Sequence, residues 1–408
     1  MADSIYIHIP FCIKKCIYCD FFSVPYDEST AYAYACALCK ELFLKKHLVG
    51  KLKSVYIGGG TPSLLPGECF RQIFSCLKDN YKLSPSTELT VEANPGTLSE
   101  SKIYLLLCLG VNRLSIGVQS FNNEELKVLG RIHTSEEALR SIAFIGKAGL
   151  RNFSIDLMYG IPAQSFNSWC ESLSKAAECS PVHISTYELT PEKETILFDL
   201  ISNPLLHPVS KGWGESKVMQ VFSECPPVAK GGEGGFSSNL KMPPEDSILD
   251  MYNYTIDSMA NNGYEHYEIS NFAKPGFQCI HNLNYWNRGE YIGAGAGAHS
   301  FIHGLRSRNV EDVQTYINQL SKGVIPEEDE MYLTLQDSLR EWIFLGLRKT
   351  QGISIKRAQN EGLDILLACR EMIDSGHIEV RDDAFRLTRK GVVISNTIIA
   401  KLFDNLDL

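Results

Sequence analysis

The sequence predicts an α/β protein whose main domain is an open, partial (β/α)6 barrel of TIM-like form, followed by a C-terminal winged-helix-like domain. The first half of the chain alternates short β-branched runs with longer amphipathic stretches, and about six such units follow one another. Apolar strands separated by helices indicate a parallel sheet with right-handed crossovers, and six units are too few for a closed eightfold barrel. After residue 326 the pattern changes to three helices, two short strands and a last helix, which is typical of a winged helix.

The six barrel strands are expected where branched and aromatic side chains gather in short runs. They are predicted at residues 4–9, 54–58, 88–92, 113–118, 153–158 and 183–188. The helical spacing of apolar residues between them predicts helices at 30–48, 67–80, 98–109, 135–148 and 166–178. In the C-terminal domain, strands are predicted at 377–380 and 385–388.

Three regions are expected along the chain. Residues 1–225 form the barrel core with its cofactor sites, 226–325 form an insertion that packs on this core, and 326–408 form the C-terminal domain. The stretch 223–246 is rich in Pro, Gly and Ser and has no hydrophobic period, which predicts a mobile surface loop.

The charge balance excludes one class of protein. The 408 residues include 39 basic and 48 acidic residues, which gives a net charge of −9. The C-terminal domain is acidic as well, with 11 basic and 15 acidic residues from Glu327 onward. Because binding to nucleic acid usually relies on neutralising phosphates, no nucleic-acid partner is expected.

The chain shows no sign of a membrane segment or of secretion. No apolar run is long enough to cross a bilayer, and a functional motif begins by residue 6, which leaves no room for a targeting peptide before it. The thirteen cysteines are not spaced as a disulfide framework. We therefore expect a soluble, cytoplasmic protein with reduced thiols.

The strongest chemical signal is the pattern Cys12-x3-Cys16-x2-Cys19, directly after the first predicted strand. Three thiolates within eight residues can converge on one inorganic centre at a small cost in loop-closure entropy. Zinc would require a fourth ligand, and none stands nearby at a usual spacing. An iron–sulfur cube held by three cysteines instead leaves one iron open to an external ligand.

The stretch HIPFCIKKCIYCDF resembles the cysteine motif of the radical S-adenosylmethionine (SAM) superfamily. The chain is similar to the branch that contains oxygen-independent coproporphyrinogen oxidase and the HemW-type haem chaperones, and most similar to the HemW type. The resemblance implies a radical SAM core with a [4Fe-4S] cluster on Cys12, Cys16 and Cys19, and SAM at the open iron. In the family, an electron donor reduces the cluster, and the electron cleaves SAM to methionine and a 5′-deoxyadenosyl radical.

The resemblance also implies which residues bind SAM, and these stand near predicted strand ends, where such a barrel gathers its chemistry. The side-chain-free backbone of the glycine segment can approach the methionine part of SAM closely. Arg131 can pair with a carboxylate, and Asp156 can accept hydrogen bonds from ribose hydroxyls. The full set implied is Tyr6, Tyr18, Gly59, Gly60, Thr61, Glu92, Gln119, Arg131 and Asp156.

Two features separate the members of this branch. The porphyrinogen oxidases carry a further cysteine two residues beyond the third cluster ligand, whereas this chain has Phe21 there. The segment HNLNYW at 281–286 resembles the HNxxYW motif of the haem chaperones. The His281 imidazole is a candidate axial ligand for haem, and Tyr285 and Trp286 offer flat faces for a porphyrin. The alternative for His281 is a buried histidine bonded to a carbonyl.

Other residues carry weaker signals. The small residues of 293–299 can let a planar ligand or another backbone come close. Cys36 and Cys39 form a C-x-x-C in a helical pattern rich in Ala and Leu, and we interpret them as small buried side chains rather than as a redox or metal pair. Weaker haem-ligand candidates are His8, His266, His299 and His303.

The sequence thus favours a protein that binds haem and hands it to an acceptor haemoprotein, for example a respiratory enzyme. The main alternative is an oxygen-independent coproporphyrinogen III oxidase of porphyrin biosynthesis. A third is a docking protein whose cluster is mainly structural. Whether the chain is an enzyme stays open at this level.

Overall fold

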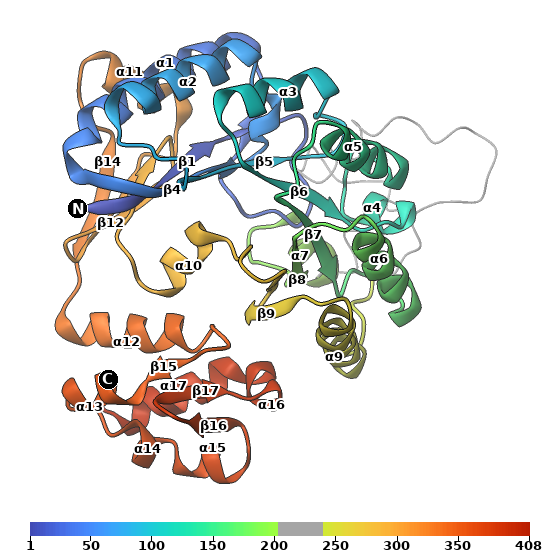
Figure 1. The fold of residues 1–408 in the computed structure, drawn as a ribbon, viewed down its shortest axis with the longest axis vertical. Coiled ribbons are helices and arrows are strands. Elements are labelled where there is room, and N and C mark those ends of the chain that lie inside the picture. Colours follow the sequence, from blue (N-terminus) through green and yellow to red (C-terminus); the bar gives the residue numbers. More distant parts are fainter. Residues whose placement is uncertain (203–239) are drawn as a thin grey trace, which may run out of the picture.

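The computed structural model describes residues 1–202 and 240–408. Residues 223–239 of the loop expected at 223–246 lie outside the described residues. Six parallel strands follow one another across one sheet in chain order (Figure 1), which confirms the predicted open (β/α)6 barrel. They are β1 (Ala2–Ile9), β4 (Val49–Gly59), β5 (Glu88–Ala93), β6 (Arg113–Gln119), β7 (Phe153–Tyr159) and β8 (His183–Glu188).

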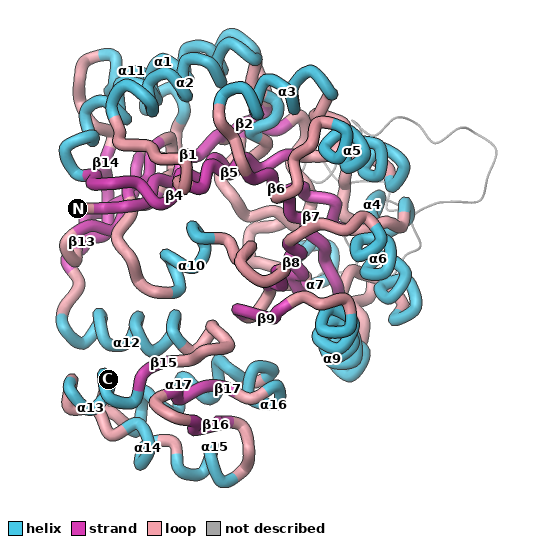
Figure 2. The backbone as a smooth tube through the Cα atoms, viewed as in Figure 1, coloured by secondary structure: helices cyan, strands magenta, loops and turns pink. Residues whose placement is uncertain are grey.

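The helices that follow the strands form an outer layer on the convex side of this sheet (Figure 2). Short polar side chains begin several of them, because an oxygen of an N-cap residue accepts a backbone N–H that has no partner within the helix. Thr134 and Glu137 form a complete capping box at one such start. These helices are α1 (Glu28–Lys45), α2 (Gly67–Asn80), α3 (Glu100–Leu109), α4 (Asn123–Val128), α5 (Ser135–Lys147) and α6 (Phe166–Glu178), with α7 (Ile196–Ser202) after β8.

Within the described residues the sheet has nine strands, three more than the six predicted for the barrel. Beside β8 run β10 (Asn271–Ala273) and then β9 (Glu265–Glu268), both antiparallel to their neighbours. Beside β1 runs the parallel strand β11 (Ile292–Ala294). Between β10 and β11 the chain forms α10 (Ile280–Trp286), and α9 (Glu245–Asn261) precedes β9.

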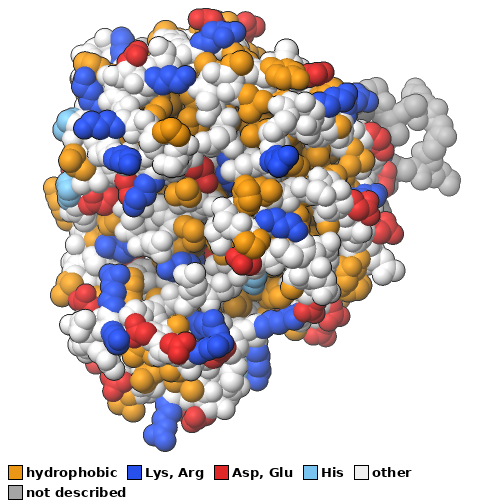
Figure 3. Space-filling view, viewed as in Figure 1, with side chains coloured by type: hydrophobic (Ala, Val, Ile, Leu, Met, Phe, Trp, Pro, Cys, Tyr) orange, Lys and Arg blue, Asp and Glu red, His pale blue; other side chains and the backbone are white. Residues whose placement is uncertain are grey.

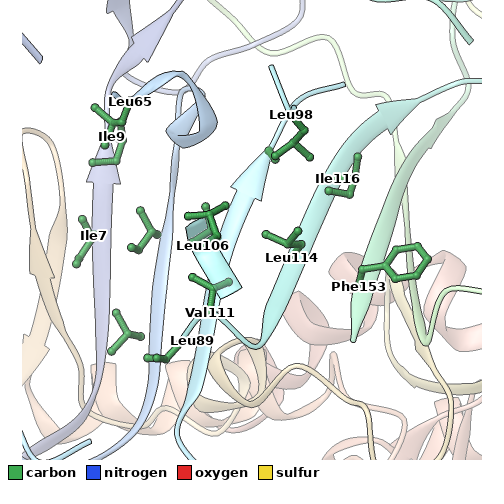
Figure 4. Close-up of a cluster of buried hydrophobic side chains, with 14 of the residues drawn as sticks. Ile7, Ile9, Leu65, Leu89, Leu98, Leu106, Val111, Leu114, Ile116 and Phe153 are labelled. Atoms are coloured by element: carbon green, nitrogen blue, oxygen red, sulfur yellow. The ribbon is translucent and has the colours of Figure 1, made fainter. Parts of the chain in front are cut away.

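The main core lies between the sheet and its helices. Figure 4 shows part of it, with side chains such as Ile7, Ile9, Leu106 and Leu114 distributed across neighbouring strands and a covering helix. These four side chains are almost fully buried, as expected for strands that are covered by helices.

A small antiparallel sheet lies beyond β11 and leads to the C-terminal region. It consists of β12 (His299–Ile302), β13 (Leu305–Asn309) and β14 (Glu327–Tyr332), with α11 (Val313–Ser321) between the last two. Near the cysteines, β2 (Phe11–Cys12) pairs with β3 (Val24–Pro25).

The C-terminal region has its own buried cluster around Ile343, Phe385 and Ile398. Its three strands form one antiparallel sheet in the order β15-β17-β16, packed with short helices in the predicted winged-helix-like form. Its elements are α12 (Leu335–Gly346), β15 (Ile353–Ser354), α13 (Ile355–Asn360), α14 (Ile365–Ala368), α15 (Arg370–Asp374), β16 (Ile378–Arg381), β17 (Ala384–Leu387), α16 (Arg389–Val393) and α17 (Ser395–Asn405).

Two further features concern surface charge and helix hydropathy. On the face shown in Figure 3, basic and acidic side chains are interspersed rather than gathered into one basic area. Within the parts of the chain that the structure describes, no helix combines the length and the hydropathy needed to span a membrane.

Candidate functional site

The cysteine segment lies at the C-terminal end of β1, as expected for the first loop of such a barrel. Its backbone is tied to two other elements: the Ile17 N–H donates to the Leu129 carbonyl (3.4 Å), and the Leu197 N–H donates to the Ile17 carbonyl (2.9 Å). Leu129 follows α4 and Leu197 lies in α7, so the segment is held by the end of one helix and the start of another.

The three cysteines are free thiols, each partly exposed. The Cys12 Sγ lies 3.7 Å from the Thr61 hydroxyl, and the Arg131 Nη1 lies 3.6 Å from the Cys16 Sγ. Burial raises the pKa of Cys19 to about 11, and the nearby Cys16 and Cys12 sulfurs raise it as well. The Cys19 thiol is therefore protonated at neutral pH, and a bound metal centre would favour its thiolate.

The donor set suits an iron–sulfur cube better than a single ion. Within residues 1–202 and 240–408, no three His, Cys, Asp or Glu side chains converge closely enough to hold one metal ion. A cube requires wider spacing, because each cysteine binds a different iron atom. A cavity of about 20 Å³ beside Cys16, Thr61 and Arg131 has room for roughly one water.

The glycine segment at the end of β4 packs against the start of the cysteine loop. A Cβ on Gly60 would lie 2.8 Å from the Phe11 carbonyl oxygen and 3.1 Å from the Cys12 Sγ. Gly59 has φ +114°, a conformation that favours glycine. The N–H groups of Gly59, Gly60 and Thr61 already donate to the Glu92 side chain and to the Ile9 and Phe11 carbonyls. Polar contacts from this segment to a ligand must therefore come from its oxygens.

Glu92 is the best-positioned carboxylate of the site. The Tyr56 hydroxyl donates to its Oε1 (2.7 Å), and the Gly59 N–H donates to its Oε2 (3.1 Å). Burial and, to a smaller extent, the charge of Asp156 raise the pKa of Glu92 to about 7. Glu92 therefore changes charge near neutral pH. Tyr56 is a site residue that the sequence reasoning missed. Side chains alternate between the two faces of a strand, so Tyr56 shares with Ser54, two residues earlier, the face of β4 that points into the barrel.

Two buried polar atoms at the site lack hydrogen-bond partners among the described residues: the Gln119 Oε1 and the Arg131 Nε. The rest of the Arg131 guanidinium donates to the Asn94 Oδ1 (2.7 Å) and to the Gly117 carbonyl (2.6 Å). Gln119 also has φ +68°, which is uncommon for a residue with a side chain. Unpaired buried groups of this kind are costly, and a polar ligand would satisfy them.

Asp156 lies in the barrel interior and accepts hydrogen bonds from three serine hydroxyls. These are Ser115 (2.9 Å), Ser154 (3.1 Å) and Ser185 (2.7 Å), each on a different strand. Burial raises the pKa of Asp156. The serines hold this carboxylate in place but also occupy much of its capacity for ligand hydroxyls.

The two tyrosines of the predicted set occupy different surroundings. The Tyr6 hydroxyl lies 3.0 Å from the His8 Nδ1, inside the barrel. Tyr18 packs against a small apolar cluster that includes Leu129 and Leu197, and burial raises its pKa.

His281 lies at the opposite end of the barrel from the cysteines. Its Nδ1 is 2.8 Å from the Ser54 hydroxyl, its Nε2 is 3.0 Å from the Tyr285 hydroxyl, and the side chain is 1% exposed. Burial and, to a smaller extent, the charge of Arg113 lower its pKa to about 3. With both nitrogens engaged, the imidazole is not free to bind iron in this conformation. It stacks on Tyr56, with ring centroids 5.1 Å apart.

The other candidate histidines and the small-residue segment also have definite surroundings. The two nitrogens of His8 meet the Tyr6 hydroxyl and the Phe22 carbonyl, whereas His299 is exposed. A Cβ on Gly295 would lie 2.4 Å from the His8 carbonyl oxygen. The small residues of 293–299 therefore allow the close approach of another backbone, one of the two expected uses.

A buried ionic network holds that segment and was not predicted. The Lys45 Nζ pairs with the Glu41 Oε1 (2.7 Å), and both side chains are almost inaccessible. Glu41 also accepts from the Gly295 N–H (2.8 Å), the Asn309 side chain (2.7 Å) and the Tyr316 hydroxyl (2.5 Å). The helical spacing of Glu41 and Lys45 was visible in the sequence, but their burial was not.

The chain is similar to two protein families and to several curated proteins. Residues 6–176 match the model of the radical SAM superfamily, and residues 333–394 match that of the HemN C-terminal domain. Among curated proteins, the heme chaperone HemW of Bacillus subtilis (strain 168) is 34% identical over 413 residues, which cover 99% of this chain and 100% of that protein. The heme chaperone HemW of Escherichia coli (strain K12) is 38% identical over 307 residues, 73% of this chain and 70% of that protein.

One solved structure is similar in fold, and this similarity is evidence for the fold only. The coproporphyrinogen III oxidase HemN from Escherichia coli, a radical SAM enzyme, superposes with a TM-score of 0.77 and 21% sequence identity over 98% of this chain and 89% of that one.

Proposed function

The chain belongs to the HemW family of heme chaperones within the radical SAM superfamily, and from this premise we propose that it binds haem and transfers it to an acceptor haemoprotein. The observation that carries the proposal is full-length similarity to curated heme chaperones at 33–34% identity. The phenylalanine at position 21 supports it, because the porphyrinogen oxidases carry a cysteine there.

Membership of the superfamily implies a [4Fe-4S] cluster and SAM. We propose Cys12, Cys16 and Cys19 as the cluster ligands, with an electron donor reaching the cluster from outside. When bound, the cluster supplies one-electron reduction of SAM. The unpaired Gln119 Oε1 and Arg131 Nε are the groups of this chain best suited to hold polar parts of SAM. An ionised Glu92 would attract its cationic groups.

The proposed haem site is separate from the cluster. His281 remains a proposed ligand only if α10 moves, because both imidazole nitrogens are engaged within the barrel. The partly exposed Trp286, whose buried Nε1 has no partner among the described residues, offers a flat face nearby.

The test is an anaerobic titration of the cluster-reconstituted full chain with haem. A saturable haem spectrum near one haem per chain, followed by transfer to an apo-haemoprotein, is the expected result. Incubation with coproporphyrinogen III, SAM and a reductant should leave the substrate's carboxyl groups intact. Turnover to protoporphyrinogen would replace the proposal with an oxidase activity.

A second experiment tests whether the two sites are separate. The triple substitution of Cys12, Cys16 and Cys19 by Ala should abolish the cluster absorbance while haem still binds. Loss of both together, in a variant whose circular dichroism is unchanged, would contradict two separate sites.

A further inference from the structure

Helices α1 and α2 pack so closely that cysteines of each helix reach the backbone of the other. The Cys76 thiol donates to the Cys39 carbonyl (3.4 Å), and the Cys69 thiol donates to the Ala31 carbonyl (3.9 Å). Small sulfur-bearing side chains at this seam allow the approach. The expectation that Cys36 and Cys39 are both buried is wrong for Cys36, which is exposed, and Cys39 is partly exposed.

One pair of these cysteines has a further property. The Cys39 thiol donates to the Gln72 carbonyl (3.7 Å), one helical turn before Cys76, while the Cys76 thiol donates to the Cys39 carbonyl, so the two side chains cross at the seam. The interaction of the two thiols raises the pKa of Cys39 and lowers that of Cys76. The Asn80 Nδ2 also points to the Cys76 Sγ (3.7 Å), where it favours a thiolate. Both cysteines are partly exposed, so a small reagent can reach them.

The other two cysteines of this seam do not complete a metal site. The Cys36 thiol is engaged with the Gln72 side chain, and the Cys69 thiol with the Ala31 carbonyl. In the described ranges, before residue 203 and after 239, no three potential ligands converge on one ion. The remaining possibility at this seam is a reaction between the two sulfurs of Cys39 and Cys76.

We propose that Cys39 and Cys76 form a reversible dithiol–disulfide site that links α1 to α2, with a low-molecular-weight disulfide as its reaction partner. The Cys76 thiolate attacks the small disulfide, which forms a mixed disulfide and expels one small thiolate. The Cys39 sulfur, after loss of its proton, then attacks the Cys76 sulfur and expels the second small thiolate. The protein loses two electrons and the small disulfide gains them, so the exchange balances and excess dithiol reverses it.

The link would join two elements that position the candidate site. Helix α1 begins soon after the cysteine loop and carries Glu41 and Lys45, which hold the segment around Gly295. Helix α2 begins a few residues after the Gly59–Gly60–Thr61 segment. The proposal does not rest on haem binding, because it concerns only the seam between these helices.

The experiment uses the full chain, kept anaerobic and incubated with glutathione disulfide. After alkylation of the remaining thiols and digestion with trypsin, we expect residues 72–78, which contain Cys76, to be joined to residues 16–40 through Cys39. The oxidised protein should unfold at a temperature higher by about 5 °C than the reduced one, because the cross-link constrains the unfolded chain. Dithiothreitol should remove both effects.

The matched controls are Cys36→Ser and Cys39→Ser. Cys36→Ser should leave the cross-link unchanged, and Cys39→Ser should abolish it while glutathione stays attached to Cys76. Because the cross-link is first measured in the unchanged chain, a misfolded variant cannot produce the result. One result would overturn the proposal: glutathione disulfide modifies the exposed Cys36 and Cys108, yet Cys39 and Cys76 are both still fully alkylated afterwards. A cross-link that joins residues 72–78 through Cys36 instead of Cys39 would overturn it as well.

Discussion

At the scale of single residues, the charge of Glu92 links the site to pH. Its pKa is raised from 4.5 to about 7, first by burial and then by Asp156. Between these two values the folded state binds more protons at Glu92 than the unfolded state does. The stability contributed by its protonated form is therefore present below pH 4.5 and is lost as the pH rises through about 7.

We predict that Glu92→Gln flattens the fall in melting temperature between pH 5 and pH 7, because the amide keeps the shape but does not titrate. Thermal unfolding across this range measures the effect. Glu268 contributes a second such group, since burial also raises its pKa to about 7, so Glu268→Gln should flatten the curve independently. An unchanged slope in both variants would contradict the assignment.

A second prediction concerns the close contact between Gly60 and the cysteine loop. Gly60→Ala should reduce the iron bound after reconstitution by more than half, because its Cβ would displace the Phe11 carbonyl and the Cys12 sulfur. Gly50→Ala, near the start of β4, is a matched control, since a Cβ there meets no atom closer than 3.7 Å. Equal iron content in both variants would show that the contact does not position the cysteines.

At the scale of elements, the Glu41–Lys45 pair fixes α1 against the segment around Gly295. Glu41→Ala would leave the Lys45 charge, the Gly295 N–H and the Tyr316 hydroxyl without this acceptor. We predict a loss of about 3–5 kcal/mol in the free energy of unfolding, the range typical of broken buried pairs.

Urea unfolding of the two chains measures this loss. Lys40→Ala, an exposed position on the same helix, should change the free energy of unfolding by less than about 0.5 kcal/mol. If the two substitutions cost the same, the network does not stabilise α1. Lys45 also pairs with Glu327 (2.8 Å), so its charge keeps one carboxylate partner in Glu41→Ala.

At the scale of the whole molecule, backbone and side-chain contacts join the C-terminal region to the barrel region. The Ile269 N–H donates to the Arg348 carbonyl (3.0 Å), and the Thr350 N–H donates to the Tyr267 carbonyl (3.2 Å). Glu341 on α12 accepts from the Arg288 Nε (2.9 Å) and the Arg306 Nε (2.8 Å), and both guanidiniums lie over the Phe301 ring. A second attachment pairs Arg389 with Asp257, but these side chains are 40% and 64% exposed.

We predict that Glu341→Ala increases amide hydrogen exchange in residues 335–346 about tenfold, which corresponds to a loss of about 1.4 kcal/mol in local stability. Arg389→Ala should change exchange much less, because exposed ion pairs contribute about 0–1 kcal/mol. The reverse order of the two effects would mean that α16 rather than α12 anchors this region.

The sequence predicted the elements with strong local signals and missed those defined by distant partners. The six barrel strands match within a few residues, because parallel strands covered by helices are nearly continuous apolar runs. Strands β9, β10 and β11 have only three or four residues each, too few for a period. The contacts of Glu41 with Asn309 and of His281 with Ser54 join residues more than 200 positions apart, and no local pattern encodes them.

One feature of the sheet has a mechanical consequence. Strands β10 and β11 lie near or at opposite edges of the open barrel, and the stretch 274–291 runs from one to the other with α10 in its course (Figure 1). This stretch connects the two sides of the open β-sheet by a covalent segment of limited length. Any widening of the barrel to admit a large flat molecule must stretch or lift this segment, and His281 with it. The width of the barrel opening and the solvent exposure of the His281 imidazole are therefore expected to change together.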